Sequence, residues 1–375
     1  MCSSDLSKGD GQWGVAWYFF GDEEVTYKFR CFEPGLPADT HNVHRTGVVP
    51  REFITEDALP GVVWNGRGWA IAHPDDLDPG DDREDYPRLA VSQVNADCHS
   101  VDAAPTVTFP ELGVLSTQLF HDGEAHLLIW EGGDRNSRAI QFSRFGAVDN
   151  LGELTEPLRP LIRDADTPVA VWNPDTRRLG IAYTKWQNDE TGENVLAAQF
   201  GPGGRRVGVE LLLSDTLVSD DPVAATNVGD DLAFSYVKKT AAEDNPLSFV
   251  PLSFEDDGLH FVEPAREVGA SLHIDHPGSD IAFDPINHVF AIAWIDSDPG
   301  ERFSQLKVSI FDEHSSFPRE VIRIPTDVER DADSPRIEWG GEGRGEGHGF
   351  ELFWAEGSSG SGIFHAQLAC PIAHK

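Results

Sequence analysis

Apolar and polar positions alternate in short segments along the whole chain, and most of these segments end on an aromatic side chain. A period of two that is rich in aromatic and β-branched residues is typical of β-strands. Seven segments close in this way, at Trp17, His73, Trp130, Tyr183, Tyr236, Trp294 and Trp354. Their steady spacing, about 53 to 60 residues, predicts a fold built from seven repeated units.

A second pattern precedes the alternating segments. The phrase Arg-Asp-Ala-Asp-Thr-Pro at Arg163–Pro168 returns as Arg-Asp-Ala-Asp-Ser-Pro at Arg330–Pro335. A tryptophan stands four residues after each proline, at Trp172 and Trp339. Looser versions stand at Asp57–Pro60, Asp220–Pro222 and Asp275–Pro277. We call these the Asp-x-Pro phrases. A phrase that recurs at a regular interval is the signature of a repeat architecture.

Each unit reads as four strands. A first strand follows the Asp-x-Pro phrase, a tight turn such as Asn65-Gly66 leads to the strand that closes on the aromatic residue, and a third and a weaker fourth strand follow. Helical periodicity is absent from the sequence. We therefore predict an all-β, seven-bladed β-propeller with four-stranded blades, forming a single domain over residues 11–375.

The amino-terminal residues predict an incomplete first blade. Cys2–Leu6 looks like the translation of a sequencing adapter, so residues 1–10 are expected to be a non-native or disordered leader. The first unit would then begin at its aromatic-closed strand and lack its innermost one. On this interpretation the native amino terminus, and any export signal, precede the present sequence.

The strand sequences carry a resemblance. Pro168–Asn173 and Ala291–Trp294 resemble the repeats of secreted, myxobacterial-type bacterial propeller proteins, and the resemblance covers nearly the whole chain after residue 10. The third unit departs from it, because no proline precedes Gln118. The resemblance implies the fold and a place outside the cell or in the cell envelope, and it implies no activity.

The charge of the chain narrows the classes of partner. Acidic residues number 64 against 29 Lys and Arg, for a net charge of −35. So negative a surface repels phosphate backbones, which disfavours nucleic acid as a partner. The sequence also lacks the roughly 18-residue apolar run that a membrane span requires. The acidity suits calcium or a cationic ligand, and the alternative is a solvated surface that only maintains solubility.

Two acidic loops are candidate calcium sites. Their ligands would be Asp75, Asp76, Asp78, Asp81, Asp82 and Asp85 in the second unit, and Asp296, Asp298 and Glu301 in the sixth. Crowded carboxylates repel one another unless a cation or water screens them, and calcium takes six to eight oxygen ligands from flexible loops. The alternative for each loop is a solvated hairpin connection.

A ligand site is predicted where the Asp-x-Pro phrases reach the mouth of the central channel. Asp166, Asp220, Asp275 and Asp333 would form a ring of carboxylates there. The alternative is that each aspartate caps its own turn by bonding a backbone N–H two residues on. Trp186, among polar residues of the loop after Tyr183, would serve as a stacking platform for a sugar ring, unless it packs against a neighbouring blade.

Cysteine spacing predicts at most one disulfide. With Cys2 set aside, Cys31, Cys98 and Cys370 remain, each expected to follow the third strand of its unit and none with CxxC spacing. In a closed ring the three units concerned are neighbours, so Cys31 is expected to pair with Cys98 or with Cys370.

Two functions follow from these patterns. The favoured hypothesis is a noncatalytic binding or scaffold propeller that presents a protein or carbohydrate ligand on its acidic face, with calcium as a stabilising ion. The alternative is a carbohydrate-active hydrolase. Such an enzyme would use two carboxylates about 5 to 9.5 Å apart at the channel mouth.

Overall fold

The structure is a computed structural model, in which the described part of the chain consists almost entirely of strands and turns. It describes residues 4–9, 11–20, 24–32, 44–50, 60–75, 88–96, 98, 107–109, 116–132, 138–146, 159–188, 192–214, 220–238, 245–271, 279–296, 305–315, 320–325, 332–342, 348–356 and 362–369. No helix occurs among these residues, so none is present there that could span a membrane.

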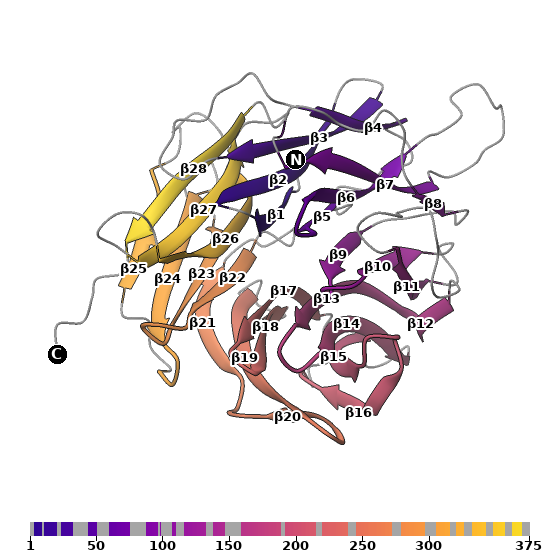
Figure 1. The fold of residues 1–375 in the computed structure, drawn as a ribbon. Helices are drawn as coiled ribbons and strands as arrows, with labels where there is room; N and C mark the ends of the chain where they lie inside the picture. Colours follow the sequence, from indigo (N-terminus) through magenta and orange to yellow (C-terminus); the bar gives the residue numbers. More distant parts are fainter. Residues whose placement is uncertain are drawn as a thin grey trace. The chain divides into compact units, whose positions relative to one another are not determined.

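The chain divides into two compact units, of which the first comprises Met1–Pro168 with Pro202–Arg205. Its described strands form three antiparallel four-stranded sheets (Figure 1). The first sheet contains β1 (Ser4–Gly9), β2 (Gln12–Phe20), β3 (Glu24–Phe32) and β4 (His44–Pro50). The second contains β5 (Gly61–Trp64), β6 (Gly68–Asp75), β7 (Arg88–Asn95) and β8 (Val107–Phe109), and the third β9 (Thr117–His121), β10 (His126–Gly132), β11 (Ala139–Phe145) and β12 (Arg159–Arg163).

The second unit comprises Val169–Gly201 and Arg206–Lys375, so the boundary falls within β13. It holds the fourth to seventh sheets. These are β13 (Ala165–Asn173), β14 (Arg178–Asn188), β15 (Gly192–Phe200) and β16 (Arg206–Leu212), then β17 (Asp220–Val228), β18 (Asp231–Lys238), β19 (Asn245–Glu255), β20 (Gly258–Phe261) and β21 (Arg266–Ser271). The last two are β22 (Ser279–Asp284), β23 (Val289–Asp296), β24 (Gln305–Asp312) and β25 (Glu320–Arg323), then β26 (Ala332–Glu342), β27 (His348–Glu356) and β28 (Gly362–Ala369).

The predicted all-β, seven-bladed fold is confirmed. All seven strand-closing side chains lie in the second strand of their sheet, and all are buried: Trp17, His73, Trp130, Tyr183, Tyr236, Trp294 and Trp354. Burying these large rings anchors the middle of each sheet, since an aromatic side chain removes 150 to 250 Å² from water.

The prediction of an incomplete first sheet is wrong. Strand β1 pairs with β2 from Ser4–Trp17 to Gly9–Gln12, so the first sheet has its innermost strand. The sequence Asp10-Gly11 carries the turn signal that favours such a hairpin, and Gly11 adopts a φ of 80°. Strand β1 thus lies within the expected leader over residues 1–10, and the non-native origin of that leader stays a prediction.

Two other sheets depart from the predicted four strands. In the fifth sheet β19 has 11 residues, enough for β20 to pair with its second half and β21 with its first. The seventh sheet has three strands among the described residues, and β28 is the last of them. In the fifth sheet, the length of the third strand therefore admits an additional strand, which alternation alone did not reveal.

Short polar side chains close the hairpins between first and second strands. Asn65 Oδ1 accepts the N–H groups of Arg67 and Gly68, and Asn173 Oδ1 accepts those of Asp175 and Thr176. Asp122 and Asp284 make the equivalent pairs of bonds. These side chains replace water at turn N–H groups, which is why Asn and Asp favour such turns.

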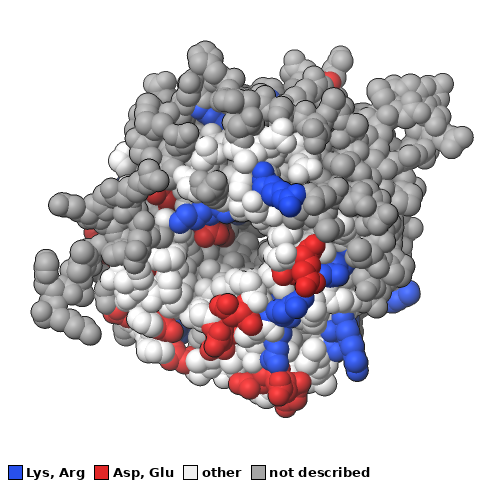
Figure 2. Space-filling model, in the orientation of Figure 1, with Lys and Arg blue, Asp and Glu red and all other residues white. Residues whose placement is uncertain are grey.

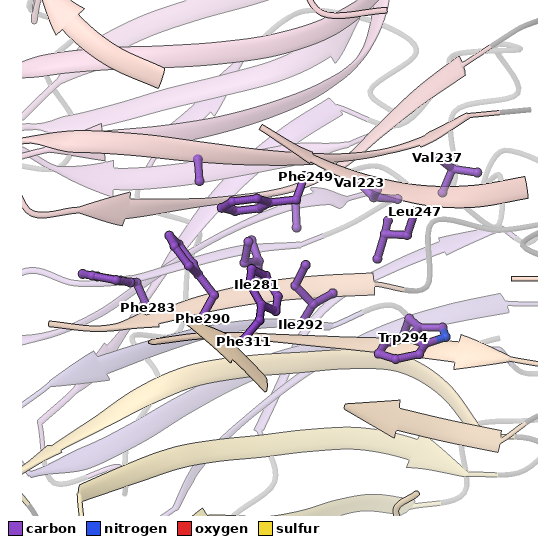
Figure 3. Close-up of a cluster of buried hydrophobic side chains, with 12 residues drawn as sticks. Val223, Val237, Leu247, Phe249, Ile281, Phe283, Phe290, Ile292, Trp294 and Phe311 are labelled. Atoms are coloured by element: carbon purple, nitrogen blue, oxygen red, sulfur yellow. The ribbon is translucent and has the colours of Figure 1, made fainter. Parts of the chain in front are cut away.

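Consecutive sheets within each unit pack face to face through apolar side chains. Figure 3 shows the cluster between the fifth and sixth sheets, where Phe249 of β19 lies against Phe290 of β23. Their ring centroids are 4.6 Å apart in an edge-to-face arrangement. Equivalent clusters join the sixth and seventh sheets and the second and third. The core is therefore a series of layers between sheets.

One disulfide joins two sheets of the first unit. Cys31 of β3 pairs with Cys98, which follows β7, and their Cα atoms are 6.2 Å apart. The predicted choice of Cys98 or Cys370 as the partner of Cys31 is thereby resolved in favour of Cys98. Cys370 lies outside the described residues.

Candidate functional site at an Asp-x-Pro phrase

Strand register places the start of the first strand and the end of the second strand at the same end of a sheet. In the second sheet, Gly61 at the start of β5 pairs with Ala72, and Asp75 at the end of β6 pairs with Arg88. In the sixth sheet, Ser279 pairs with Trp294 and Asp296 with Gln305. Within each of these sheets, the first strand therefore begins at the end where the second strand leads into its connection to the third.

Most predicted site residues lie outside the part of the structure in which side chains are described. Eight of them lie outside the described residues altogether: Asp76, Asp78, Asp81, Asp82, Asp85, Asp275, Asp298 and Glu301. For five others the structure describes the backbone but not the side chain. They are Asp75 in β6, Trp186 in β14, Asp220 in β17, Asp296 in β23 and Asp333 in β26. The calcium sites and the sugar platform stay predictions, and Asp166 is the predicted ligand residue whose side-chain contacts can be described.

Asp166 shares a cation with a buried glutamate. Arg138 Nη1 lies 3.3 Å from Asp166 Oδ2 and 3.2 Å from Glu131 Oε1. The Glu131 side chain is only 4% exposed, whereas Arg138 is 39% exposed. The second oxygen of Glu131 accepts the backbone N–H of Thr167 at 3.0 Å. One carboxylate and one guanidinium from the third blade, those of Glu131 and Arg138, thus bind the Asp-x-Pro phrase.

The positions of these residues follow from the strands. Glu131 comes directly after the closing residue Trp130 near the end of β10, and Arg138 directly precedes β11. The corresponding residues after the other six closing side chains are Tyr18, Pro74, Thr184, Val237, Ile295 and Ala355. An acidic residue occurs at this position in the third unit alone, and that signal could have identified Glu131 from the sequence.

The phrase itself is held in unusual backbone conformations. Asp164 has a φ of 55° and Thr167 a φ of 44°, both in the left-handed region that residues other than glycine rarely adopt. Such conformations cost about 1 to 3 kcal/mol each and need support from their surroundings. That support comes from the third sheet, through Glu131 at the Thr167 N–H and through the Arg138 carbonyl at the Asp164 N–H.

The capping bond considered for the phrase aspartates does not form in the way expected. The residue two positions after each of Asp166, Asp220, Asp275 and Asp333 is a proline, which has no N–H to donate. The described carboxylate, that of Asp166, instead accepts a hydrogen bond from Arg138.

A second contact type joins the phrases to the preceding sheet. Gln118 Nε2 donates to the carbonyl of Pro168 at 2.5 Å, and in the other copy Asp280 Oδ2 accepts the N–H of Ile337 at 2.9 Å. Gln118 and Asp280 occupy the same place, the second residue of a first strand. Burial raises the pKa of Asp280, opposed by the charge of Arg336. Each of these bonds thus holds a phrase, or a residue just after it, to the first strand of the preceding sheet within one unit of the chain.

The charges of this cluster differ from those of a hydrolytic carboxyl pair. A hydrolytic pair requires one protonated carboxyl group and one free carboxylate. Here the guanidinium of Arg138 stabilises negative charge on Glu131 and Asp166 together. Over the described residues, no group of three or more His, Cys, Asp or Glu side chains is arranged to hold a metal ion.

Charge is mixed on the face that Figure 2 draws. Acidic and basic side chains of the described residues lie next to one another there, over a largely uncharged surface. Among the described contacts, Arg178 pairs with Asp256 at 2.7 Å, and Arg206 with Glu210 at 3.1 Å. Basic side chains therefore neutralise part of the acidic charge within the described strands and turns.

Comparison with known proteins shows the fold. No protein-family model matches the chain, and no curated protein matches it. Among solved structures, the periplasmic gluconolactonase PpgL of Pseudomonas aeruginosa is 16% identical, with a TM-score of 0.54 over 85% of this chain and 84% of that one. The β-propeller domain of the Trilobed protease from Pyrococcus furiosus is 11% identical, with a TM-score of 0.48 over 98% of both chains.

The chain has a seven-bladed β-propeller fold. At 16% identity, the similarity to the gluconolactonase extends to the fold and leaves activity open.

Proposed function

We propose that this chain is a noncatalytic binding or scaffold propeller of the bacterial cell exterior. It would present a protein or carbohydrate ligand at the sheet ends where first strands begin and second strands end, with the Asp-x-Pro phrases and the acidic loops there, and calcium would stabilise it. The observation that carries the proposal is the sharing of Arg138 by Glu131 and Asp166. Both carboxylates bind Arg138 and thereby fix the Asp-x-Pro phrase. This arrangement supports a rigid binding surface rather than a catalytic carboxyl pair.

Calcium enters the proposal through charge and position. The loop from Asp75 to Asp85 connects β6 and β7, and Asp296 to Glu301 belongs to the connection between β23 and β24. Both connections leave their sheets at the end where the first strand begins. A hard divalent cation would relieve the repulsion among these carboxylates without requiring a rigid cage.

The exterior location rests on the disulfide and on the strand sequences. A disulfide such as Cys31–Cys98 persists in oxidising compartments and is rare in the cytosol. The repeats resemble those of secreted, myxobacterial-type propellers. Both features support export to the cell envelope or beyond.

The calcium part is tested by thermal unfolding in millimolar calcium and in chelator at one ionic strength. We expect calcium to raise the Tm of the parent through mass action. The double variant Asp76→Asn with Asp81→Asn should lose the shift. Magnesium or added sodium must fail to reproduce it, because general screening of a net charge of −35 also raises stability. Equal Tm values for the parent in the two buffers would refute the calcium site.

The binding part is tested against the hydrolase alternative by incubating the chain with aryl glycosides and polysaccharides. We expect no turnover above buffer, and retention of the folded chain on at least one immobilised polysaccharide or cell-surface protein fraction. Turnover that Glu131→Gln or Asp166→Asn abolishes without loss of folding would overturn the proposal and establish a carboxylate-dependent hydrolase.

A further inference from the structure

Two histidines face each other across the hairpin that joins β9 and β10. His121 pairs with His126 in the strand register, and their ring centroids are 5.1 Å apart with an interplanar angle of 65°. The other side of the His126 ring stacks on Phe145 of β11, with centroids 5.3 Å apart and planes 17° apart. His126 is completely buried. It therefore occupies a position within the third sheet that a fully apolar ring could fill.

The hydrogen bonding of the pair is incomplete. The N–H of Gly123 donates to His121 Nδ1 at 3.3 Å. His121 Nε2 and both ring nitrogens of His126 are buried without a hydrogen bond of acceptable geometry. Because Nδ1 of His121 accepts, the proton of the neutral ring lies on Nε2. A metal at Nε2 would have to break the Gly123 bond, so the arrangement disfavours a metal site and fits two neutral rings.

The nearest carboxylate is already engaged. Asp122 Oδ2 accepts two bonds from Arg144, at 3.0 Å and 2.9 Å, and Asp122 Oδ1 accepts the N–H groups of Glu124 and Ala125. The Glu124 carboxylate also lies on Arg144, at 3.3 Å. The Asp122 carboxylate thus holds the turn and Arg144, and would have to give up bonds to receive an imidazolium.

Among the described side chains, the elements packed against β9 add little that could take up a proton's charge. Strand β5 carries no titratable side chain, and His73 of β6 bonds Ser92 and the Pro74 carbonyl. The other titratable residue of β6 is Asp75, whose side chain lies outside the described ones. The ionisable groups that act on His126 are His121, which disfavours a proton on it, and Asp122, which favours one. The backbone at Gly146 and Phe145 also favours the proton, and the contribution at Gly146 exceeds that of Asp122.

We propose that the His121–His126 pair makes the third sheet acid-sensitive, so that protonation drives His126 out of the core and opens the β9–β10 hairpin. Opening would release Thr117 and Gln118 at the start of β9, which bond the Ala72 and Pro168 carbonyls. Glu131 near the end of β10 would be freed from the Thr167 N–H. Acid would thereby loosen the strained phrase at the proposed binding surface. The inference does not depend on calcium or on ligand identity.

The pH window follows from the direction of the pKa shifts. Burial lowers the pKa of His126 from 6.5 to about 4, and burial lowers the pKa of His121 as well, with Asp122 opposing. Between these values the unfolded hairpin binds protons that the folded one does not. Stability therefore rises with pH across this window, is fully present above about pH 6.5, and is lost as pH falls toward 4.

Amide hydrogen exchange of the whole chain, followed by peptide mass spectrometry, tests the proposal. With exchange corrected for its intrinsic pH dependence, we expect protection of residues 117–132 to fall about 30-fold from pH 7.5 to pH 5, the ratio that a shift from 6.5 to 4 produces for one group. His126→Phe retains a ring beside Phe145 and should remove most of that loss. His260→Gln, at an exposed histidine paired with Asp257, should leave it unchanged.

Several outcomes would overturn the proposal. One is protection of residues 117–132 that changes less than about threefold over this pH range. Others are a loss that survives in His126→Phe, or one that His260→Gln removes. If His126→Phe fails to fold, NMR titration of the wild-type imidazoles decides, since a His126 that protonates at or above pH 6.5 without loss of the hairpin signals excludes the mechanism.

Discussion

Glu131 makes two contacts of different kinds with its two carboxylate oxygens. One oxygen faces a guanidinium that is partly exposed, and the other accepts a backbone N–H of a residue in a strained conformation. The two contacts respond differently to substitution, because an amide can still accept from the N–H but cannot neutralise Arg138. At the scale of single residues, this difference separates charge from geometry.

We predict that Glu131→Ala destabilises the chain by about 2 to 3 kcal/mol, since the Thr167 N–H loses its acceptor and Arg138 a buried partner. Glu131→Gln should cost about 1 kcal/mol, since Oε1 of the amide replaces the lost acceptor. Urea unfolding of the three proteins measures both values. Equal costs for the two variants would show that charge alone matters, and a neutral Glu131→Ala would remove Glu131 from the account.

The contacts of single residues were the feature that the sequence alone predicted least well. Asp166 was predicted as a ligand from its repeated phrase, but the sequence does not show that Glu131 and Arg138 reach it, since they lie 35 and 28 positions earlier in another sheet. The pairing depends on how two sheets meet, which alternation does not encode. The sole acidic residue after a closing aromatic was the available signal.

At the scale of elements, the β19–β20 hairpin joins the fourth and fifth sheets along their outer strands. Gln199 Nε2 donates to the Glu255 carbonyl at 3.0 Å, and Arg178 pairs with Asp256. Gly208 of β16 lies directly under this turn, at a register irregularity with a φ of 73°. A Cβ atom on Gly208 would overlap the carbonyl oxygen of Asp257. The hairpin therefore needs glycine at this position.

We predict that Gly208→Ala destabilises the chain by about 2 kcal/mol or more, through backbone strain and the overlap with Asp257. Gly203→Ala is the matched control. A Cβ atom at Gly203 meets nothing within 4 Å, so this change should stay within about 0.5 kcal/mol. Thermal and urea unfolding compare the two variants. If both alanines cost the same, the tight contact under the hairpin is not what holds it.

Elements were predicted well where alternation ends on a large ring. The second strands of all seven sheets were found this way, because their buried aromatic residues recur at a nearly constant interval. Strand β1 was not predicted, because Ser4–Gly9 contains one large apolar residue, Leu6, and the alternation of apolar and polar residues is weak there. The Asp10-Gly11 turn signal was the better guide to that hairpin.

At the scale of the whole molecule, a disulfide adds to the stability that the layered cores provide. The Cys31–Cys98 disulfide closes a loop with a sequence separation of 67 residues. Constraining the unfolded chain over such a length contributes about 4 kcal/mol in the chain-entropy model.

We predict that reduction, or Cys98→Ser, lowers stability by about 2 to 4 kcal/mol. Cys370→Ser should have no comparable effect. Urea unfolding with and without reductant measures the difference, and peptide mapping identifies the pair. A map that joins Cys31 to Cys370, or unchanged stability on reduction, would contradict the assignment.

The central claim about function is that the acidic loops bind calcium as part of a binding surface. Isothermal titration of calcium into the chelator-stripped chain at about 0.15 M ionic strength, where exposed charges are well screened, tests it most directly. We expect saturable binding with at least one site per chain, lost in the Asp76→Asn with Asp81→Asn variant. Absence of saturable heat at several temperatures, or an isotherm that the double variant leaves unchanged, would contradict it.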